Sequence, residues 1–403
     1  MRVLQINTVF GKGSTGTIVK EIEYLLERSG HESYIAFARG DSDNSHHYHI
    51  GNEIDHKIHS FLFSRILGIQ GLGSRYYTYK LTKWIAQIKP DVIQIHTLHA
   101  HFINIKVLFS FLNRSKIPVV WSFFDCWPFT GKCTHFTEVN CYKWKTGCNN
   151  CPHLHLGAKT YFFDRTKKMY EIKKAYCSSL DKLDIIVCSN WLKKIVEYSI
   201  YKNHPIHMIY NWIDTTKFKQ IQDYTIITKY GIPTDKKVIV SVSAFWGKIN
   251  TRLTDALRLA KILPEGFQMV LVGNMDSGIS LPENVLHINY VEGTRDLSVI
   301  YSSALAYVNF SVEDTFGKVI AEAMLCGTPA IVFNATACPE VVGDVGYVVD
   351  PHNVDDMFEK IKVIAANGRD YYSERCISHV KKNYDFTTNV SKYLDIYTSK
   401  VKQ

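Results

Sequence analysis

The sequence predicts two doubly wound α/β domains in one chain of 403 residues. Short apolar segments alternate with helical patterns in both halves, as in a parallel sheet covered by helices. The series stops at a junction around residues 190–235 and starts again near Lys237. The chain is also long enough for about two domains, each with its own core.

The first half opens with a strand. Residues 1–7 have the apolar pattern of a β-strand but not the long apolar segment of a signal peptide or a membrane span. We therefore expect a cytoplasmic protein. Helices are expected, for example, over Gly16–Arg28 and Ile103–Asn113, and strands over Val3–Ile6, Ser33–Ala38, Val92–His96, Pro118–Phe123 and Ile185–Cys188.

The second half repeats the alternation. Its apolar segments are separated by helical or turn-rich stretches, which indicates a second parallel sheet. The expected strands are Val238–Ala244, Gln268–Gly273, Val285–Tyr290, Ala306–Phe310, Ala330–Phe333 and Tyr347–Val349.

The positive charge of the chain lies in its first half. Residues 1–190 contain 24 Lys and Arg against 15 Asp and Glu, whereas residues 191–403 contain 23 of each kind. A basic half attracts anionic partners such as a membrane surface, a lipid pyrophosphate or nucleic acid. Residues 61–84 mix aromatics and cations, as interfacial helices do. A helix packed on the sheet with a solvated basic face explains the same pattern.

Residues 304–333 carry the most informative pattern. An apolar strand is followed by two acids and a glycine, an amphipathic helix, and a Gly-Thr-Pro stop before the next strand. Ligands bind at the carboxyl edge of such sheets. Gly317 allows helix-start N–H groups to approach a phosphate, and carboxylates accept hydrogen bonds from sugar or ribose hydroxyls. An ordinary amphipathic helix with a surface acid is the alternative.

This segment, from Glu313-Asp314 to Cys326-Gly327-Thr328-Pro329, resembles the donor-site signature of the retaining glycosyltransferase family 4. Glu322 matches the second acid of that signature, and Asp314, with Glu313 beside it, stands at the first. The resemblance implies that Glu322 holds the nucleotide ribose and that Asp314 or Glu313 holds the sugar hydroxyls. It also places Phe316, Gly317 and Lys318 at the donor.

The resemblance implies the GT-B fold, two Rossmann-like domains that face a cleft. We expect an N-terminal acceptor domain over residues 1–190 with a cysteine-rich insertion at 131–152, and a C-terminal donor domain over 191–375. Residues 376–403 should form a helix that crosses back to the first domain. Ile209–Asp214 resembles the linker of the family.

The activity implied is transfer of a sugar, with retention, from a nucleotide-diphosphate donor to a saccharide or lipid-linked saccharide. Residues 118–152 resemble a subgroup that builds bacterial surface polysaccharides. We therefore expect no catalytic cofactor and no nucleic-acid partner. The expected acceptor is a saccharide or a polyprenyl-diphosphate-linked saccharide at the inner face of the cytoplasmic membrane, with peripheral membrane contact through the basic domain. A sugar phosphorylase or epimerase and a non-catalytic sugar-nucleotide-binding protein remain alternatives.

A glycine-rich loop, Gly11-Lys12-Gly13-Ser14-Thr15-Gly16, follows the first strand. Its spacing is that of a dinucleotide fingerprint, but no acid ends the second strand. Arg39 at that place would suit the 2′-phosphate of NADP, so an NADP-dependent oxidoreductase is a further alternative. The family resemblance instead places Gly13 and Gly16 near the donor phosphate and the acceptor.

Cations and histidines follow other strands. The resemblance points to Lys248 and Arg252 as partners of the leaving diphosphate, with solvated surface charges as the alternative. His96 and His99 follow the strand at 92–96 and suit proton transfer or phosphate binding. The subgroup has a histidine where this chain has Phe124, so Asp125, His96 and His99 become the candidates. Structural, hydrogen-bonded histidines are the alternative.

Four of the ten cysteines lie close together in the insertion. Cys148 and Cys151 have the C-x-x-C spacing of a metal knuckle, and Cys133 and Cys141 precede them. A cytosolic chain uses such cysteines as thiols or metal ligands rather than as disulfides. We expect a structural zinc ion, with reduced, partly buried thiols as the alternative.

Overall fold

The computed structural model describes residues 1–248 and 251–402. It divides into two compact units: unit 1 contains residues 1–209 and those from Val390 onward, and unit 2 contains residues 210–389. The division expected between residues 190 and 191 falls at the start of helix α6 (Asn190–Val196), within unit 1. The terminal segment expected from residue 376 starts inside helix α13 (Asp370–Asn383).

Unit 1 is built on a seven-stranded parallel sheet. Its strand order is β3-β2-β1-β4-β5-β6-β7, so the direction of winding changes between β1 and β4. Apolar runs form the central strands because both faces of a parallel sheet are covered. The strands are β1 (Arg2–Val9), β2 (Glu32–Arg39), β3 (His47–His49), β4 (Val92–Ile95), β5 (Val119–Phe123), β6 (Leu183–Val187) and β7 (Ile206–Met208).

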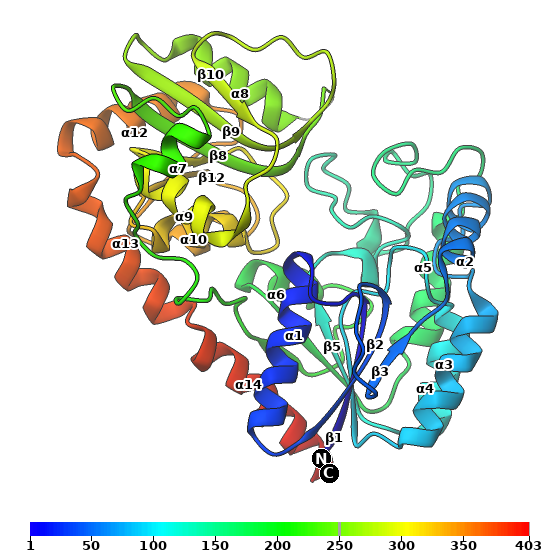
Figure 1. The fold of residues 1–403 in the computed structure, drawn as a ribbon. Coiled ribbons are helices and arrows are strands. Elements are labelled where there is room, and N and C mark those ends of the chain that lie inside the picture. The colour runs from blue at the N-terminus through cyan, green and yellow to red at the C-terminus, as the bar shows by residue number, and fades with distance from the viewer. Residues whose placement is uncertain (249–250, 403) are drawn as a thin grey trace. The chain divides into compact units, whose positions relative to one another are not determined.

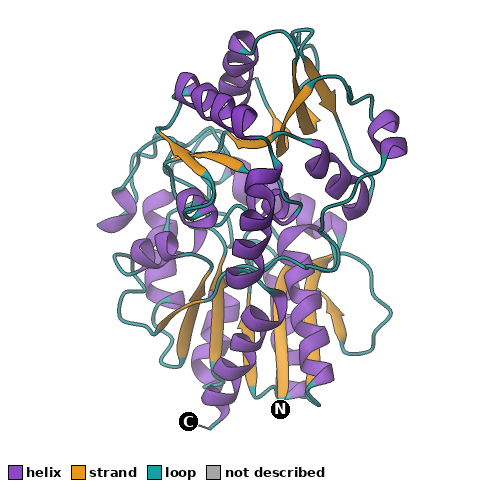
Figure 2. Ribbon diagram, turned by 90° about the vertical axis from the view of Figure 1, so that its left-hand side faces the viewer, coloured by secondary structure: helices purple, strands orange, loops and turns teal. Residues whose placement is uncertain are grey.

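Helices lie on both sides of this sheet (Figure 1). Figure 2 shows its strands running side by side behind the helices of one face. Two helices continue into π-helical segments, α2 into η1 and α5 into η4. The helices are α1 (Gly13–Arg28), α2 (Glu53–Ile58), η1 (His59–Ile66), α3 (Arg75–Ile88), α4 (Ile105–Ser115), α5 (Thr166–Ile172), η4 (Lys173–Cys177) and α6.

Unit 2 has a six-stranded parallel sheet of order β10-β9-β8-β11-β12-β13, whose winding reverses between β8 and β11. Its strands are β8 (Lys237–Trp246), β9 (Phe267–Met275), β10 (Val285–Ile288), β11 (Ala306–Asn309), β12 (Ala330–Phe333) and β13 (Tyr347–Val349). Its helices are α7 (Tyr224–Lys229), α8 (Thr251–Ile262), α9 (Gly293–Ser303), α10 (Lys318–Leu325), α11 (Cys338–Val342), α12 (Val354–Asn367) and α13.

The last helix, α14 (Phe386–Val401), begins in unit 2 and ends in unit 1. Its later residues belong to the core of unit 1, because the Tyr397 hydroxyl donates to Gln94 Oε1 at 3.0 Å and Tyr393 lies 3.2 Å from Ser122 Oγ. Lys400 and Asp184 form an ion pair with little solvent exposure. The last residues of the chain are therefore part of unit 1.

All eleven predicted strands are present, and the predicted α/β class is confirmed. The edge strands β3 and β7 were not predicted, because each has only three residues and no apolar run. Between β5 and α5 the regular structure consists of two short 3₁₀ turns, η2 (Trp127–Phe129) and η3 (Lys143–Lys145). Of the described helices, none combines the length and the apolar character needed to cross a bilayer.

Candidate functional site

The loop between β11 and α10 leaves the unit 2 sheet at its carboxyl edge, beside the reversal between β8 and β11. Its last residue, Gly317, has a φ of 92° and caps α10. A residue with a side chain rarely adopts this conformation, so glycine is needed for the sharp entry into the helix. The first N–H groups of α10 have no side-chain cap and can meet an anion. The neighbours expected at the donor differ in exposure, because Phe316 is buried whereas Lys318 is only partly buried.

Asp314 is held within this loop. Its Oδ2 accepts a hydrogen bond from Asn309 Nδ2 at 2.9 Å and lies 3.9 Å from Cys338 Sγ. Its main-chain carbonyl accepts from the N–H of Ala337 at 3.2 Å. Glu313 is partly buried beside it, and its N–H donates to Ser311 Oγ. Both acids therefore occupy a fixed turn at the sheet edge.

Glu322 lies inside α10, one turn after Lys318, and is partly buried. Burial raises the pKa of its carboxyl above the ordinary value, and the positive charge of Lys318 opposes this rise. Among residues 1–248 and 251–402 its carboxylate has no hydrogen-bond or ion-pair partner. A half-buried carboxylate without a partner is costly unless a ligand supplies the donors.

The two candidate cations after β8 lie in different surroundings. Arg252 Nη2 donates to Ser311 Oγ at 2.8 Å, which brings its guanidinium to the loop that carries Glu313 and Asp314. The N–H of Lys248 donates to Asp276 Oδ2 at 2.9 Å, and its side chain is exposed. Residues 249 and 250 between them lie outside the described residues. Only Arg252 of the two thus contacts the acidic loop.

In unit 1 the glycine-rich loop follows β1. Gly11 and Gly13 have φ values of 69° and 65°, and the Gly11 N–H donates to the Gly16 carbonyl at 3.1 Å. A Cβ atom on Gly16 would lie 3.2 Å from both Gly11 N and Val9 O, so the tight loop needs glycine there. The loop closes on itself at the start of α1.

The loop after β4 is tied to the end of β1. Thr8 Oγ1 lies 3.0 Å from the carbonyl of Thr97 and 2.9 Å from that of His99, and the Thr97 N–H donates to Asn7 Oδ1. Ala100 and the residue after it both have positive φ values. The glycine-rich loop and the histidine loop therefore follow the two strands, β1 and β4, that flank the reversal of the unit 1 sheet.

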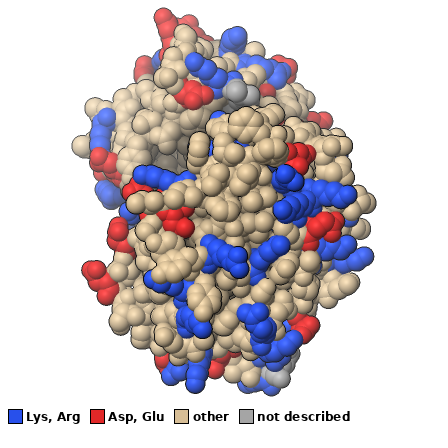
Figure 3. Space-filling view, turned by 90° about the vertical axis from the view of Figure 1, so that its right-hand side faces the viewer, with Lys and Arg blue, Asp and Glu red and all other residues tan. Residues whose placement is uncertain are grey.

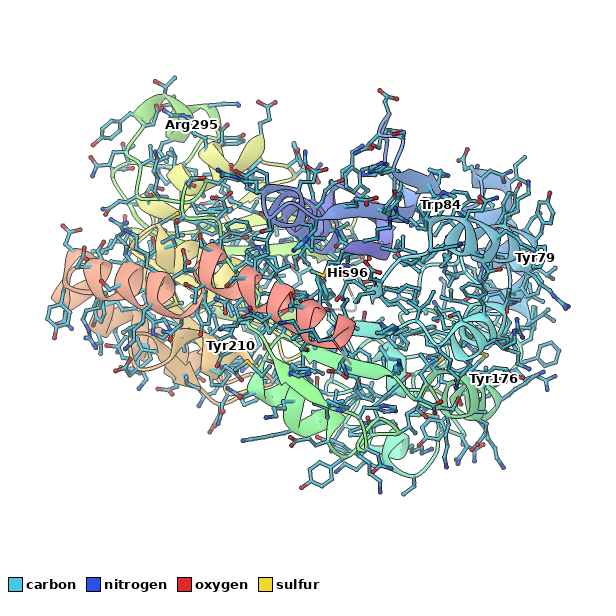
Figure 4. The ribbon with its side chains drawn as sticks, turned by 90° about the horizontal axis from the view of Figure 1, so that it is seen from below. Tyr79, Trp84, His96, Tyr176, Tyr210 and Arg295 are labelled. Carbon is cyan, nitrogen blue, oxygen red and sulfur yellow. The ribbon has the colours of Figure 1, made fainter. Side chains whose placement is uncertain are left out.

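His96 lies in the interior of unit 1 (Figure 4). Its Nε2 lies 3.0 Å from Gln5 Oε1, its ring stacks on Phe124, and burial lowers its pKa to about 3. His96 is therefore a neutral core histidine in this structure. This placement agrees with the structural alternative that the sequence left open.

His99 and Asp125 form a pair at the same sheet edge. The imidazole Nε2 of His99 lies 2.7 Å from Asp125 Oδ2, and Asp125 Oδ1 accepts from the Trp127 N–H at 2.8 Å. Burial alone would raise the pKa of Asp125, but the charge and hydrogen bond of His99 and the bond from Trp127 lower it overall. With 27% of its side chain exposed, His99 can reach a ligand while Asp125 orients it.

A lysine that the sequence did not single out holds this loop. Lys173, in η4, is fully buried and donates to the carbonyls of Trp127 at 2.6 Å and Thr130 at 2.9 Å. Its ammonium lies 3.6 Å from the centre of the Trp127 ring. Lysine is rarely buried, and nothing in its sequence neighbourhood, Ile172-Lys173-Lys174, distinguishes it from a surface lysine.

The four cysteines of the insertion surround one small cavity. The Gly131 N–H donates to Cys148 Sγ at 3.2 Å, Cys133 Sγ lies 4.0 Å from His153 Nδ1, and Cys141 and Cys151 line the same space. In the described part of the chain, no three His, Cys, Asp or Glu side chains are arranged to hold a metal ion. The sulfurs are gathered but do not form a ligand set, and the structural zinc stays a prediction.

Two family profiles match the chain. The profile described as Glycosyltransferase Family 4 covers residues 15–217, and Glycosyl transferases group 1 covers residues 223–383. The chain is 22% identical to WcaC of Escherichia coli K12 over 85% of each chain; WcaC is described as a glycosyl transferase of colanic acid biosynthesis. The O-antigen chain mannosyltransferase B of Escherichia coli is 44% identical over 18% of each chain.

Solved structures share the fold. Sucrose-phosphate synthase of Thermosynechococcus elongatus superposes with a TM-score of 0.69 at 15% identity, over 99% of this chain and 98% of its own. Anabaena Alr3699/HepE in complex with UDP-glucose gives 0.66 at 15% identity, over 99% of this chain and all of its own. The predicted GT-B fold is confirmed.

Proposed function

The chain is a member of glycosyltransferase family 4, and we propose that it transfers a sugar, with retention of configuration, from a nucleotide-diphosphate donor. The acceptor would be a saccharide or a lipid-linked saccharide. The observation that carries this proposal is Glu322, a half-buried carboxylate without a described partner, next to the uncapped start of α10. The carboxylate of Glu322 therefore lacks hydrogen-bond donors, and the hydroxyl groups of a ribose would provide them.

The donor would lie along the carboxyl edge of the unit 2 sheet. Glu322 would accept hydrogen bonds from the ribose, and Asp314 or Glu313 from the sugar. The helix-start N–H groups after Gly317, together with Arg252, would stabilise the diphosphate as it leaves. The fixed loop geometry supports this assignment, because the Arg252 guanidinium and the main-chain N–H of Glu313 both donate to Ser311 Oγ. Lys248 is a secondary candidate.

The acceptor would meet the loops of unit 1. His99, oriented by Asp125, is placed to accept or share the proton of an acceptor hydroxyl. The glycine-rich loop after β1, in which Gly13 is exposed and Gly16 is buried, would lie near the donor phosphate and the acceptor. His96 has no such role in the proposal, because its ring is buried.

The biological context follows from the relatives. Their names, colanic acid and O-antigen synthesis, support a role in a bacterial surface polysaccharide. We propose a lipid-linked acceptor at the inner face of the cytoplasmic membrane, reached through the basic unit 1. Anabaena Alr3699/HepE was solved with UDP-glucose, which supports a nucleotide-sugar donor here. No catalytic cofactor is needed for the proposed transfer.

A ligand panel tests the proposal. The melting temperature is measured separately with saturating UDP, GDP, ADP, CDP and NADP. A ligand at about a hundred times its dissociation constant raises the free energy of unfolding by about 2.7 kcal/mol. We expect one nucleoside diphosphate to raise the melting temperature by a few degrees. The matching nucleotide sugars are then assayed for nucleotide release with and without acceptor glycans. Stabilisation by NADP alone would contradict the proposal.

The alternatives give different results in the same assays. A phosphorylase or epimerase would convert sugar without an acceptor, and a non-catalytic binder would be stabilised by nucleotide without turnover. An NADP-dependent oxidoreductase is not favoured, because the matching family profiles and relatives are glycosyltransferases.

A further inference from the structure

The continuous helix formed by α2 and η1 exposes apolar side chains. Ile54, Ile58, Phe61 and Leu62 are 69, 50, 58 and 42% exposed. Their spacing of four, three and one residues places them on one face of the helix. Monomeric proteins rarely expose contiguous apolar surface without a partner.

The opposite face of the same helix is buried and polar. His59 Nδ1 lies 2.9 Å from Ser74 Oγ, and its Nε2 accepts from the Gly71 N–H at 3.2 Å. His56 Nε2 lies 2.9 Å from the Ile50 carbonyl. These buried bonds fix the rotation of the helix, so its apolar face is directed outward. The usual arrangement of a surface helix is the reverse.

A second segment extends the apolar face. The Tyr161 N–H donates to the Arg65 carbonyl at 2.8 Å, which places the loop at 160–163 against the end of η1. Tyr161, Phe162 and Phe163 are 42, 68 and 45% exposed. We call the seven exposed residues of the two segments the apolar face; they are Ile54, Ile58, Phe61, Leu62, Tyr161, Phe162 and Phe163.

Cations border the apolar face. Arg65, Lys159 and Arg165 are exposed, and none of them forms an ion pair with a described residue. Lys159 lies over the ring of Tyr161 and Arg165 over that of Phe163, at 5.7 and 5.4 Å. Lys and Arg side chains are also spread over the side of unit 1 that Figure 3 turns to the viewer. The border therefore offers positive charge that the protein does not neutralise.

We propose that the apolar face docks on an anionic lipid bilayer. Apolar side chains would enter the boundary between headgroups and acyl chains, and the bordering cations would meet lipid phosphates. Charge complementarity argues for a bilayer, since a second copy of the chain would bring like charges together. The role of this docking rests on the proposed function: it would bring unit 1 to a lipid-linked acceptor.

Vesicle sedimentation tests the docking. Full-length protein is mixed with vesicles of phosphatidylcholine alone and with vesicles containing about a third phosphatidylglycerol, and the bound fraction is measured against lipid concentration. We expect binding to the anionic vesicles that weakens at high salt. The variant Phe61→Ser/Phe162→Ser should lower the partition coefficient by at least about tenfold. Lys159→Gln/Arg165→Gln should weaken binding only to anionic vesicles.

The matched control is Tyr224→Ser/Tyr290→Ser, which removes two exposed aromatics of unit 2, 74 and 73% exposed. It should bind as the wild type does. Equal binding by the Phe61→Ser/Phe162→Ser variant, or no binding by the wild type, overturns the proposal. The proposal is also overturned if light scattering shows that the wild type is a dimer and that Phe61→Ser/Phe162→Ser is a monomer. Nucleotide stabilisation measured without vesicles tests the proposed transferase separately.

Discussion

The imidazole of His99 and the carboxylate of Asp125 are 2.7 Å apart, although they follow different strands. The pair exists because β4 and β5 are neighbours in the parallel sheet and end at the same edge. Asp125 is oriented by the Trp127 N–H. Lys173 donates to the Trp127 carbonyl and so holds the loop after β5, which carries Asp125 and Trp127. The chain thus has an oriented histidine in a region where Phe124 replaces the histidine of the related subgroup.

Replacing either member of the pair should slow transfer. For His99→Gln and Asp125→Asn we expect kcat to fall by about a hundredfold, the lower range for general acid–base groups. His46→Gln, an exposed histidine of unit 1, serves as the control. Because the pKa of Asp125 is lowered in the folded protein, its stabilising effect is complete above the unfolded pKa and is lost as pH falls through the folded value. The melting-temperature difference between wild type and Asp125→Asn should therefore shrink in acid.

Glu322→Gln should weaken donor binding. The glutamine side chain keeps the shape of the glutamate but replaces one acceptor oxygen with an NH₂ donor and removes the negative charge. We therefore expect nucleotide affinity to fall by about tenfold or more. Isothermal titration with the nucleotide identified by the panel measures this. Glu265→Gln, at an exposed position of the same unit, is the matched control. Unchanged affinity in Glu322→Gln would mean that this carboxylate does not hold the nucleotide.

Arg252→Gln should separate phosphate binding from base binding. Its guanidinium lies at Ser311, next to the proposed diphosphate position. We expect affinity for the nucleoside diphosphate to fall about tenfold, because a charged hydrogen bond is lost, while affinity for the nucleoside is unchanged. Lys248→Gln should have a smaller effect. An equal loss for nucleoside and diphosphate would show a structural role instead.

Lys173 should make stability depend on pH. Burial lowers its pKa to about 7, whereas the unfolded chain keeps an ordinary lysine. Between these values the unfolded state binds more protons, so stability rises with pH from about 7 towards about 10, by up to about 1.4 kcal/mol per pH unit. Lys173→Met should lose this rise, and Lys174→Met, at an exposed neighbour, should keep it. Thermal melts at several pH values compare the three proteins.

Metal analysis decides the predicted zinc. Protein purified without chelator should contain about one zinc ion per chain, and Cys148→Ser or Cys151→Ser should lose both the metal and thermal stability. Protein with less than about a tenth of an equivalent, and with the same melting temperature after chelation, would contradict the prediction. The cysteines would then be reduced thiols around a small cavity.

The strands were predictable because parallel sheets require apolar runs. Gly317 was predictable because glycine allows the main chain at a helix start to come close to a phosphate. The role of Lys173 could not be predicted, since its burial depends on a loop more than forty residues earlier in the chain. The burial of His96 could not be predicted either, because the residue after a buried strand can point inward or outward. Its partner Gln5 lies in the neighbouring strand β1 but is far away in the sequence. Sequence thus located the sheet edges but not which side chains reach solvent there.

The path of α14 also sets an order of events during synthesis. The residues that complete the core of unit 1, Tyr393 and Tyr397, are synthesised only after all of unit 2 has been made. Gln94 and Ser122 therefore have no hydrogen bond to these tyrosines until unit 2 has been synthesised. Unit 2 is contiguous and can fold as it emerges, whereas unit 1, although made first, is finished second. A chain that stops before Tyr393 would therefore damage the unit that was made first.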